Sequence, residues 1–208
     1  MDIVAPKIEK YLIDLLPERD EALVEMEAIA SKTGFPIIGP LVGRLLAQVT
    51  ILSGARRILE LGSGFGYSAY WFAKAVATDG KVICTDTDPK NRDRALGFFK
   101  QGGLLDRVDF RVGNALQIIE ELSGEFDIIL NDIDKEQYPE AFRKAVPRVK
   151  RGGLLITDNV IRSGRVAESN PDNSTKAIME FNKLIYNTHE LWTTIIPLRD
   201  GVSLTLKL

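Results

Sequence analysis

From residue 56 onward, short apolar runs alternate with stretches that carry helical spacing. The runs are RILEL (57–61), KVICTD (81–86), VDFRV (108–112), FDIILND (126–132) and GLLITDN (153–159). The intervening stretches lie near 67–77, 89–101, 115–122 and 138–149. Strands that alternate with helices of this length predict βαβ units, and therefore a parallel sheet with right-handed connections.

The first 52 residues have a different pattern, which predicts three helices and no strand. One helix carries apolar residues from Ile8 to Leu15, and a second runs from about Pro17 to a glycine stop at Gly34. After a loop at residues 35–40, a third helix carries its apolar face from Leu41 to Val49. The apolar positions at helical spacing are Ile8, Tyr11, Leu12 and Leu15, then Leu23, Met26, Ile29 and Ala30, then Leu41, Leu45, Leu46 and Val49.

The end of the chain departs from the alternating pattern. After a helix near 173–188, the runs WTTIIPL and VSLTLKL flank the short turn Arg199-Asp200-Gly201, which predicts a β-hairpin. The one long irregular stretch, about 160–172, has the length of a functional loop. We predict a single domain over residues 1–208, with N-terminal helices in 1–52 and a cofactor-binding core in 53–208.

Composition narrows the class of protein. The chain of 208 residues is 45% hydrophobic and 27% charged, with a formal net charge of -2, so the bulk charge gives no sign of nucleic-acid binding. Its only cysteine, Cys84, excludes an intrachain disulfide and a cysteine zinc cluster. There is no run of membrane-spanning length and no secretory pattern at the start. We therefore expect a cytoplasmic protein without a membrane partner.

A glycine-rich loop follows the first predicted strand and opens a helix. It reads ELGSGFGYS (60–68), where Gly62, Gly64 and Gly66 allow a tight turn and close approach of a ligand. In an open α/β sheet, ligands bind beyond the carboxyl ends of the strands. Asp86 ends the second strand, where an acid can accept both hydroxyls of a ribose. The loop therefore predicts a nucleoside site.

The spacing of the loop indicates which nucleoside. It reads G-x-G-x-G, whereas the dinucleotide fingerprint is G-x-G-x-x-G with a helix aimed at a pyrophosphate. S-adenosylmethionine has no phosphate but carries an ammonium, a carboxylate and a sulfonium. Glu60 suits the ammonium, and Ser68 with nearby amides suits the carboxylate. The third strand ends in Gly113-Asn114-Ala115, where we expect the adenine.

The motif ELGSGFGYS resembles the first motif of class I methyltransferases, and its GYS ending resembles the catechol and caffeoyl-CoA O-methyltransferase family. The resemblance runs from Ile38 to Gly201. It implies a Rossmann-like, doubly wound sheet of seven strands with the last strand antiparallel, and a homodimer. It also implies that Ile38, Glu60, Ser68, Asp86, Ala115 and Asp132 contact the cofactor. Asp86 is shorter than the family's usual Glu, and Asn114 replaces a common Asp; its amide oxygen can still accept a hydrogen bond from adenine.

Two predicted strands end in polar groups that a core does not need: Asp132 after one, and Asp158 with Asn159 after the next. Helix caps would account for either strand alone. Because consecutive parallel strands end at the same sheet edge, their oxygens can converge on a hard cation, Mg²⁺ with Ca²⁺ or Mn²⁺ as alternatives. The family pattern D-x-D-K followed by D-N matches 132–135 and 158–159. The resemblance implies that Lys135 is the general base.

Four functions are compatible with these residues. The first is a metal-dependent O-methyltransferase acting on a catechol-like or other small hydroxylated acceptor. The second is a tRNA hydroxyuridine O-methyltransferase, for which Lys7, Lys10, Arg162 and Arg165 leave room although the pI of about 5.6 argues against it. A nicotinamide oxidoreductase is disfavoured by the glycine spacing. A binding protein without catalysis is disfavoured by Lys135 and the three oxygen ligands.

Overall fold

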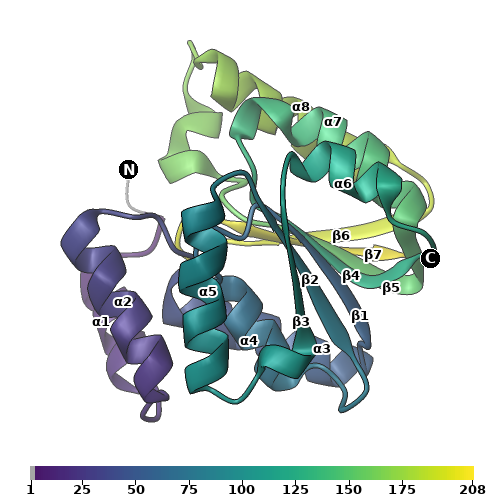
Figure 1. Cartoon of the computed structure of the whole chain (residues 1–208). Helices are drawn as coiled ribbons and strands as arrows, with labels where there is room; N and C mark the ends of the chain where they lie inside the picture. The colour runs from purple at the N-terminus through teal and green to yellow at the C-terminus, as the bar shows by residue number, and fades with distance from the viewer. Residues whose placement is uncertain (1–2) are drawn as a thin grey trace.

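The computed structural model describes residues 3–208 as an open, twisted sheet with helices on both faces (Figure 1). The helices are α1 (Pro6–Asp14), α2 (Glu21–Thr33), α3 (Gly39–Ser53), α4 (Tyr67–Ala75), α5 (Pro89–Gln101), α6 (Ala115–Glu121), α7 (Tyr138–Ala145) and α8 (Asn173–Asn187). Short 3-10 turns are η1 (Leu105–Arg107), η2 (Lys135–Gln137), η3 (Val146–Arg148) and η4 (Arg162–Ala167). No helix in this described part is long and apolar enough to cross a membrane.

The sheet has seven strands in the order β3-β2-β1-β4-β5-β7-β6. They are β1 (Arg57–Leu61), β2 (Lys81–Asp86), β3 (Val108–Val112), β4 (Phe126–Asn131), β5 (Val149–Thr157), β6 (Leu191–Ile196) and β7 (Val202–Lys207). The first five pair in parallel, and β7 pairs antiparallel with both β5 and β6. The predicted doubly wound sheet, its reversed last strand and the terminal hairpin are confirmed.

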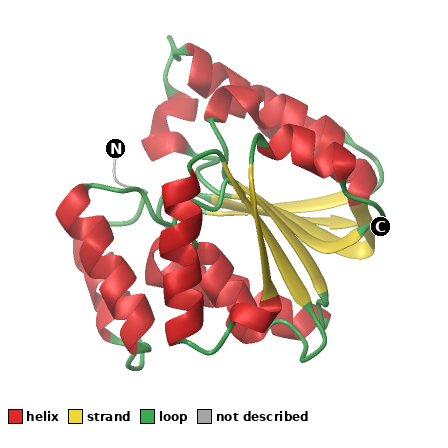
Figure 2. Ribbon diagram, in the orientation of Figure 1, coloured by secondary structure: helices red, strands yellow, loops and turns green. Residues whose placement is uncertain are grey.

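Two layers of helices sandwich the sheet, which is the yellow layer between the red helices in Figure 2. Helices α6, α7 and α8 cover one face, where Leu59, Ile129 and Phe181 belong to a buried apolar cluster. Helices α3, α4 and α5 cover the other face, where Ile58, Ile128 and Phe72 belong to a second cluster. Burial on both faces explains why the central strands read as nearly continuous apolar runs.

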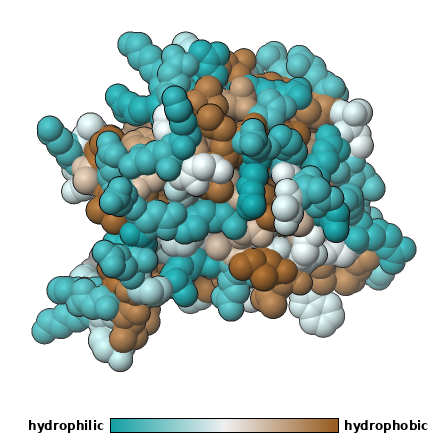
Figure 3. Space-filling view, turned by 60° about the horizontal axis from the view of Figure 1, so that its bottom comes forward, coloured by the Kyte–Doolittle hydropathy of each residue, from teal (hydrophilic) through white to brown (hydrophobic). Residues whose placement is uncertain are grey.

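The N-terminal helices differ from prediction in two respects. The predicted start of the second helix at Pro17 is wrong: α2 begins at Glu21, after Asp20. The Asp20 carboxylate instead accepts hydrogen bonds from Lys74 and Tyr70, which tie the start of α2 to α4. The face of α1 from Ile8 to Leu15 forms at the expected spacing, but none of its residues is buried. The N-terminal helices lie at the left of Figure 1, and on the left of Figure 3 brown hydrophobic side chains interrupt the hydrophilic surface.

The loop at 160–172 is partly ordered by the terminal hairpin. The amides of Val160 and Ile161 donate to the carbonyls of Gly201 and Asp200, at 3.0 and 2.9 Å. The Ser163 amide donates to the Asp200 carboxylate. The segment after β5 and the turn between β6 and β7 therefore form one layer at the carboxyl edge of the sheet.

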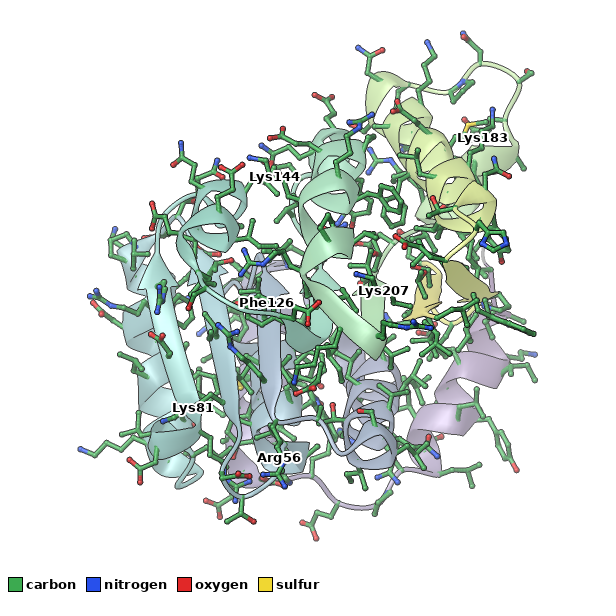
Figure 4. The ribbon with its side chains drawn as sticks, turned by 90° about the vertical axis from the view of Figure 1, so that its right-hand side faces the viewer. Arg56, Lys81, Phe126, Lys144, Lys183 and Lys207 are labelled. Atoms are coloured by element: carbon green, nitrogen blue, oxygen red, sulfur yellow. The ribbon has the colours of Figure 1, made fainter. Side chains whose placement is uncertain are left out.

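The amino edge of the parallel strands lies on the side viewed in Figure 4, where Arg56, Lys81 and Phe126 stand at the starts of β1, β2 and β4. The Arg57 guanidinium lies 4.3 Å from the centre of the Phe126 ring. Arg148 donates hydrogen bonds to the carbonyls of Ile119, Leu122 and Gly124. At this edge Arg57 packs on an aromatic ring and Arg148 caps backbone carbonyls. The polar groups that a ligand would use lie at the opposite, carboxyl edge of the sheet.

Candidate active site

A cavity of about 580 Å³ opens at the carboxyl ends of the parallel strands, beside the point where the strand order reverses between β1 and β4. This is the position at which doubly wound sheets bind ligands. Nearly all of the predicted site residues line it: Ile38, Gly62, Gly64, Ser68, Asp86, Gly113, Asn114, Ala115, Asp132, Lys135, Asp158 and Asn159. Glu60 is the exception and lies behind the cavity wall.

The glycine loop is held against β2 by a small set of hydrogen bonds. The Ser63 amide donates to the Thr85 carbonyl at 2.7 Å, and the Gly62 amide donates to the Thr85 hydroxyl at 3.2 Å. Gly62 has a φ of 85°, and a Cβ there would lie 2.5 Å from the backbone oxygen of Asp132. No other residue fits without moving one of the two strands. The loop is thus shaped by its glycine and anchored by Thr85.

Glu60 is fully buried at the end of β1 and accepts a short hydrogen bond from the Ser68 hydroxyl. Its second oxygen, Oε2, has no hydrogen-bond partner among residues 3–208. Burial raises the pKa of Glu60 to about 7, although the hydrogen bond from Ser68 acts in the opposite direction. Because Ser68 lines the cavity, the carboxyl is one side chain away from a bound ligand.

Asp86 and Asn114 stand at the carboxyl ends of β2 and β3. Asp86 Oδ1 accepts hydrogen bonds from the Asp88 amide at 2.8 Å and from Asn91 at 3.1 Å, which fixes the carboxylate at the strand end. Asn114 caps α6: its Oδ1 accepts from the amides of Leu116 and Gln117 at 2.9 and 3.3 Å. An adenine amine would therefore share the Asn114 oxygen with the helix cap.

The two polar strand ends meet as the sequence predicts. Asp132, Asp158 and Asn159 line the same cavity, and Lys135 Nζ lies 2.8 Å from Asp132 Oδ1. Asp158 is buried, and its Oδ1 has no hydrogen-bond partner in the described chain. Its backbone oxygen accepts from the Tyr138 hydroxyl at 2.9 Å, which fixes the strand end.

The two carboxylates influence each other. Burial raises the pKa of Asp158, and the neighbouring charge of Asp132 raises it further. Burial also raises the pKa of Asp132, while the Lys135 ammonium opposes that shift. Buried Asp158 and half-buried Asp132 are neighbouring acids that resist joint ionisation, and a cation would stabilise their charged forms.

A second cavity of about 330 Å³ adjoins the first. It is lined by Ile3, Val4, Pro6, Glu9, Asn159, Ser163, Arg199 and Asp200. Asn159 and Arg199 line both cavities, so they flank the boundary between them. Sequence reasoning missed Arg199, and it also missed Phe35 and Ile37, which line the larger cavity. Arg199 is far from the other site residues in sequence, and its only local signal was a charged residue in a turn.

The sheet has seven strands with one reversed, and the glycine loop and Asp86 lie where the strand order switches. This combination defines a Rossmann-like class I methyltransferase. The family model described as O-methyltransferase matches residues 18–208, so the chain belongs to the O-methyltransferase family and is an S-adenosylmethionine-dependent O-methyltransferase of the catechol and caffeoyl-CoA type.

Relatives and solved structures agree with this family. A catechol O-methyltransferase from Niastella koreensis is 33% identical over 211 residues, which cover 96% of this chain and 96% of that protein. The crystal structure of an O-methyltransferase from Bacillus cereus in complex with SAH has a TM-score of 0.88 and 29% identity, over 97% of each chain. The O-methyltransferase TomG from Streptomyces achromogenes, in complex with SAM, has a TM-score of 0.88 and 28% identity, over 97% of this chain and 96% of that one.

Proposed function

We propose that this O-methyltransferase uses a divalent cation, Mg²⁺ in the first instance, to methylate one hydroxyl of a small catechol-like acceptor. The observation that carries the proposal is the meeting of Asp132, Asp158 and Asn159 beside Lys135 on the wall of the cofactor cavity. A site built only to bind the cofactor needs neither a third oxygen ligand nor a positioned lysine.

The residues present fit a hard cation. The donor set is two carboxylates and one amide, all oxygen, and Asp158 Oδ1 is a buried acceptor without a partner in residues 3–208. Within those residues, no group of three or more His, Cys, Asp or Glu side chains could hold a metal, so the Asn159 amide and water would complete the coordination. When bound, the cation would lower the pKa of an acceptor hydroxyl and orient its oxygen.

Lys135 is proposed as the group that takes the acceptor proton. In the ion pair with Asp132 its Nζ is an ammonium, which cannot act as a base. A cation held by the Asp132 carboxylate would compete with the lysine for that carboxylate and weaken this ion pair. Lys135 Nζ would then accept the proton from the hydroxyl. S-adenosylmethionine supplies the methyl group, and its sulfur keeps the electron pair of the broken bond, so no covalent bond to the enzyme forms.

The cofactor contacts proposed from the sequence follow the lining of the larger cavity. Asp86 would accept the ribose hydroxyls, and Gly113 to Ala115 would border the adenine. Ser68 and the loop amides would hold the carboxylate end. Glu60 would act from behind Ser68, with its unpartnered oxygen available to the ammonium. The acceptor would then enter from the smaller cavity, which shares Asn159 and Arg199 with the larger one.

The size of the smaller cavity favours a small acceptor. A volume of about 330 Å³ lies at the lower end of the range for small-molecule pockets. The tRNA alternative gains no support from three of the basic residues that suggested it, because each faces a carboxylate of its own chain. Arg165 and Arg162 lie 3.2 and 3.8 Å from Asp172, and Lys10 lies 2.6 Å from Asp14. Acceptors named for relatives, such as catechol, are therefore the first candidates.

The test is a methyl-transfer screen of catechols and bulk tRNA with labelled S-adenosylmethionine, before and after metal removal. We expect transfer to a catechol that is lost with EDTA and restored by Mg²⁺. Full activity of a metal-stripped sample would refute the cation, and would leave Asp158 and Asn159 as a strand-end cap. Transfer to tRNA alone would replace the proposed acceptor.

A further inference from the structure

Arg199 occupies a backbone conformation that is costly for its residue type. It lies in the turn between β6 and β7 with a φ of 50°, in the left-handed region that favours glycine. A glycine would be accommodated there with less strain. A long cationic side chain kept at a strained position near a cavity is a candidate for a functional group.

The side chain of Arg199 is directed toward the loop at residues 35–40, between α2 and α3. Its Nη1 donates to the Ile37 carbonyl at 2.7 Å, and a Cβ at Gly39 would lie 3.4 Å from its Cδ and Nε. Within residues 3–208, Arg199 forms no ion pair. A half-buried guanidinium with five donors is therefore held in place by one carbonyl, and no carboxylate neutralises it at contact distance.

The position of this charge is the central observation. Asn159 and Arg199 are the two residues that line both cavities, so the methyl group would pass between the cavities beside the guanidinium. The positive charge extends to the acids of the site, because Arg199 lowers the pKa of both Asp132 and Asp158 against the effect of burial. If the cofactor occupies the larger cavity and the acceptor the smaller one, the acceptor oxygen would meet the methyl group at this boundary, beside the guanidinium.

Most of the other charged groups around the two cavities already have a partner; for example, Asp86 at the end of β2 accepts hydrogen bonds from the Asp88 amide and Asn91. Lys135 is paired with Asp132, and Asp200 accepts the Ser163 amide. Glu9 of α1 lines the wall of the smaller cavity, while Asp134 and Asp158 line the larger one. Arg199 is the cation of this set that is not engaged in an ion pair with a described residue.

We propose that Arg199 contacts the acceptor oxygen and stabilises it as an anion during methyl transfer. This inference rests on the proposed function. The proton of the acceptor hydroxyl goes to Lys135 Nζ, the oxygen forms the new bond to carbon, and Arg199 remains protonated throughout. Preorganised positive charge beside the oxygen lowers the free energy of the ionised acceptor relative to its neutral hydroxyl, so a larger fraction of the bound acceptor is ready to attack the methyl group. Arg199 would thus supplement the cation held by Asp132, Asp158 and Asn159 from the opposite side of the boundary.

The test uses 4-nitrocatechol, whose anion absorbs visible light, bound to the enzyme with S-adenosylhomocysteine and Mg²⁺. Absorbance against pH gives the pKa of the bound phenol without turnover. We expect Arg199→Gln to raise this pKa by about one unit, a tenfold change in ionisation, and Arg199→Lys to restore most of the shift. Arg165→Gln is the matched control, because Arg165 is exposed, pairs with Asp172 and lines neither cavity.

The outcomes separate the two levels of inference. If 4-nitrocatechol fails to bind the unmodified enzyme, the proposed acceptor class is wrong, and the role of Arg199 is overturned with it. If it binds and its pKa is the same in the unmodified enzyme and in Arg199→Gln, the proposed function stands and the role of Arg199 is overturned. A purely structural role, through the bond to Ile37, would weaken S-adenosylhomocysteine binding and leave the phenol pKa unchanged.

Discussion

Lys135 Nζ lies 2.8 Å from Asp132 Oδ1, and the same carboxylate belongs to the proposed cation site. In the proposed mechanism, the Asp132 carboxylate would have two competing partners, Lys135 and a bound cation. Metal binding would then weaken the ion pair between Asp132 and Lys135 and leave Lys135 Nζ available to the acceptor hydroxyl.

Replacement of Lys135 tests the proposed base. Lys135→Ala should lower kcat by roughly 10²–10⁴-fold, the usual contribution of a positioned general base. Raising the pH should recover part of the loss, because solvent hydroxide can remove the proton. The pH dependence of kcat for both forms measures this effect. A variant with unchanged kcat would show that the metal alone suffices to ionise the acceptor.

Replacement of Asp158 separates metal binding from cofactor binding. Asp158→Ala should lower turnover far more than the affinity for S-adenosylmethionine, since in the proposed site Asp158 would contact the metal and not the cofactor. Asp132→Ala, the comparison variant, should lower both, because Asp132 would lie between the metal and the cofactor. Turnover assays paired with calorimetry distinguish the two patterns. Equal damage to cofactor binding by both variants would contradict the assignment.

Asp158 also carries a consequence for stability. Burial raises the pKa of this carboxyl, so above its unfolded pKa the folded chain pays a desolvation cost for the ionised form. Asp158→Asn should therefore raise the Tm of the metal-free protein at pH 8 while it lowers activity. Thermal melts of both proteins with and without Mg²⁺ measure these Tm values. Mg²⁺ should raise the Tm of the unmodified protein but not that of Asp158→Asn.

Glu60 should make cofactor affinity depend on pH. With a folded pKa of about 7, the carboxyl is mostly protonated at pH 6 and mostly ionised at pH 8. If the ionised form pairs with the cofactor ammonium, affinity should fall about tenfold from pH 8 to pH 6. Calorimetry in buffers of different ionisation enthalpy should also detect a released proton. Glu60→Gln should bind more weakly with a flatter pH dependence, and an identical slope in that variant would rule out Glu60.

The same shift has the opposite sign for the ligand-free fold. A carboxyl whose folded pKa is raised from 4.5 to about 7 favours the folded state at low pH. Its contribution to the free energy of unfolding decreases as pH rises between those values. Glu60→Gln should remove this dependence, which denaturant melts from pH 5 to pH 8 would measure.

The exposed face of α1 predicts self-association. Ile8, Tyr11 and Leu15 are 53%, 59% and 62% exposed, and they lie on one side of a helix that buries none of its residues. We expect a homodimer that uses this face, and we expect Tyr11→Glu to weaken it. Light scattering at micromolar concentration measures the mass, with Lys7→Glu as a control. A monomeric unmodified protein would reject the dimer.

Local patterns were sufficient for the parts of the site that adjoin strands. The glycine loop, Asp86, Asp132 and Asp158 each follow an apolar run, and parallel pairing brings the ends of these runs to one edge. The same logic placed the hairpin, because a turn of Arg199 to Gly201 separates two alternating runs. Neither inference required knowledge of contacts between distant residues.

Distant contacts account for what the sequence did not predict. The bond from Arg199 to Ile37 joins positions 162 residues apart, and no local pattern records it. Helix α2 begins at Glu21, and Asp20 just before it accepts a hydrogen bond from Lys74 of α4, a contact that the local sequence does not record. Glu60 does not line the cavity, because β1 is packed between β2 and β4 and the Glu60 carboxyl accepts a hydrogen bond from Ser68, which does line it. In each instance tertiary contacts decide the outcome.

The position of β7 between β5 and β6 determines when the enzyme becomes complete during synthesis. The cofactor loop forms from residues near 60, whereas the wall of the smaller cavity needs Arg199 and Asp200, which the turn before β7 supplies. A nascent chain that ends before residue 199 would carry the glycine loop but lack the boundary between the cavities. If the acceptor is bound in the smaller cavity, methyl transfer would require the turn that holds Arg199 and Asp200, and a chain truncated before this turn would keep every motif of the cofactor site and lose activity.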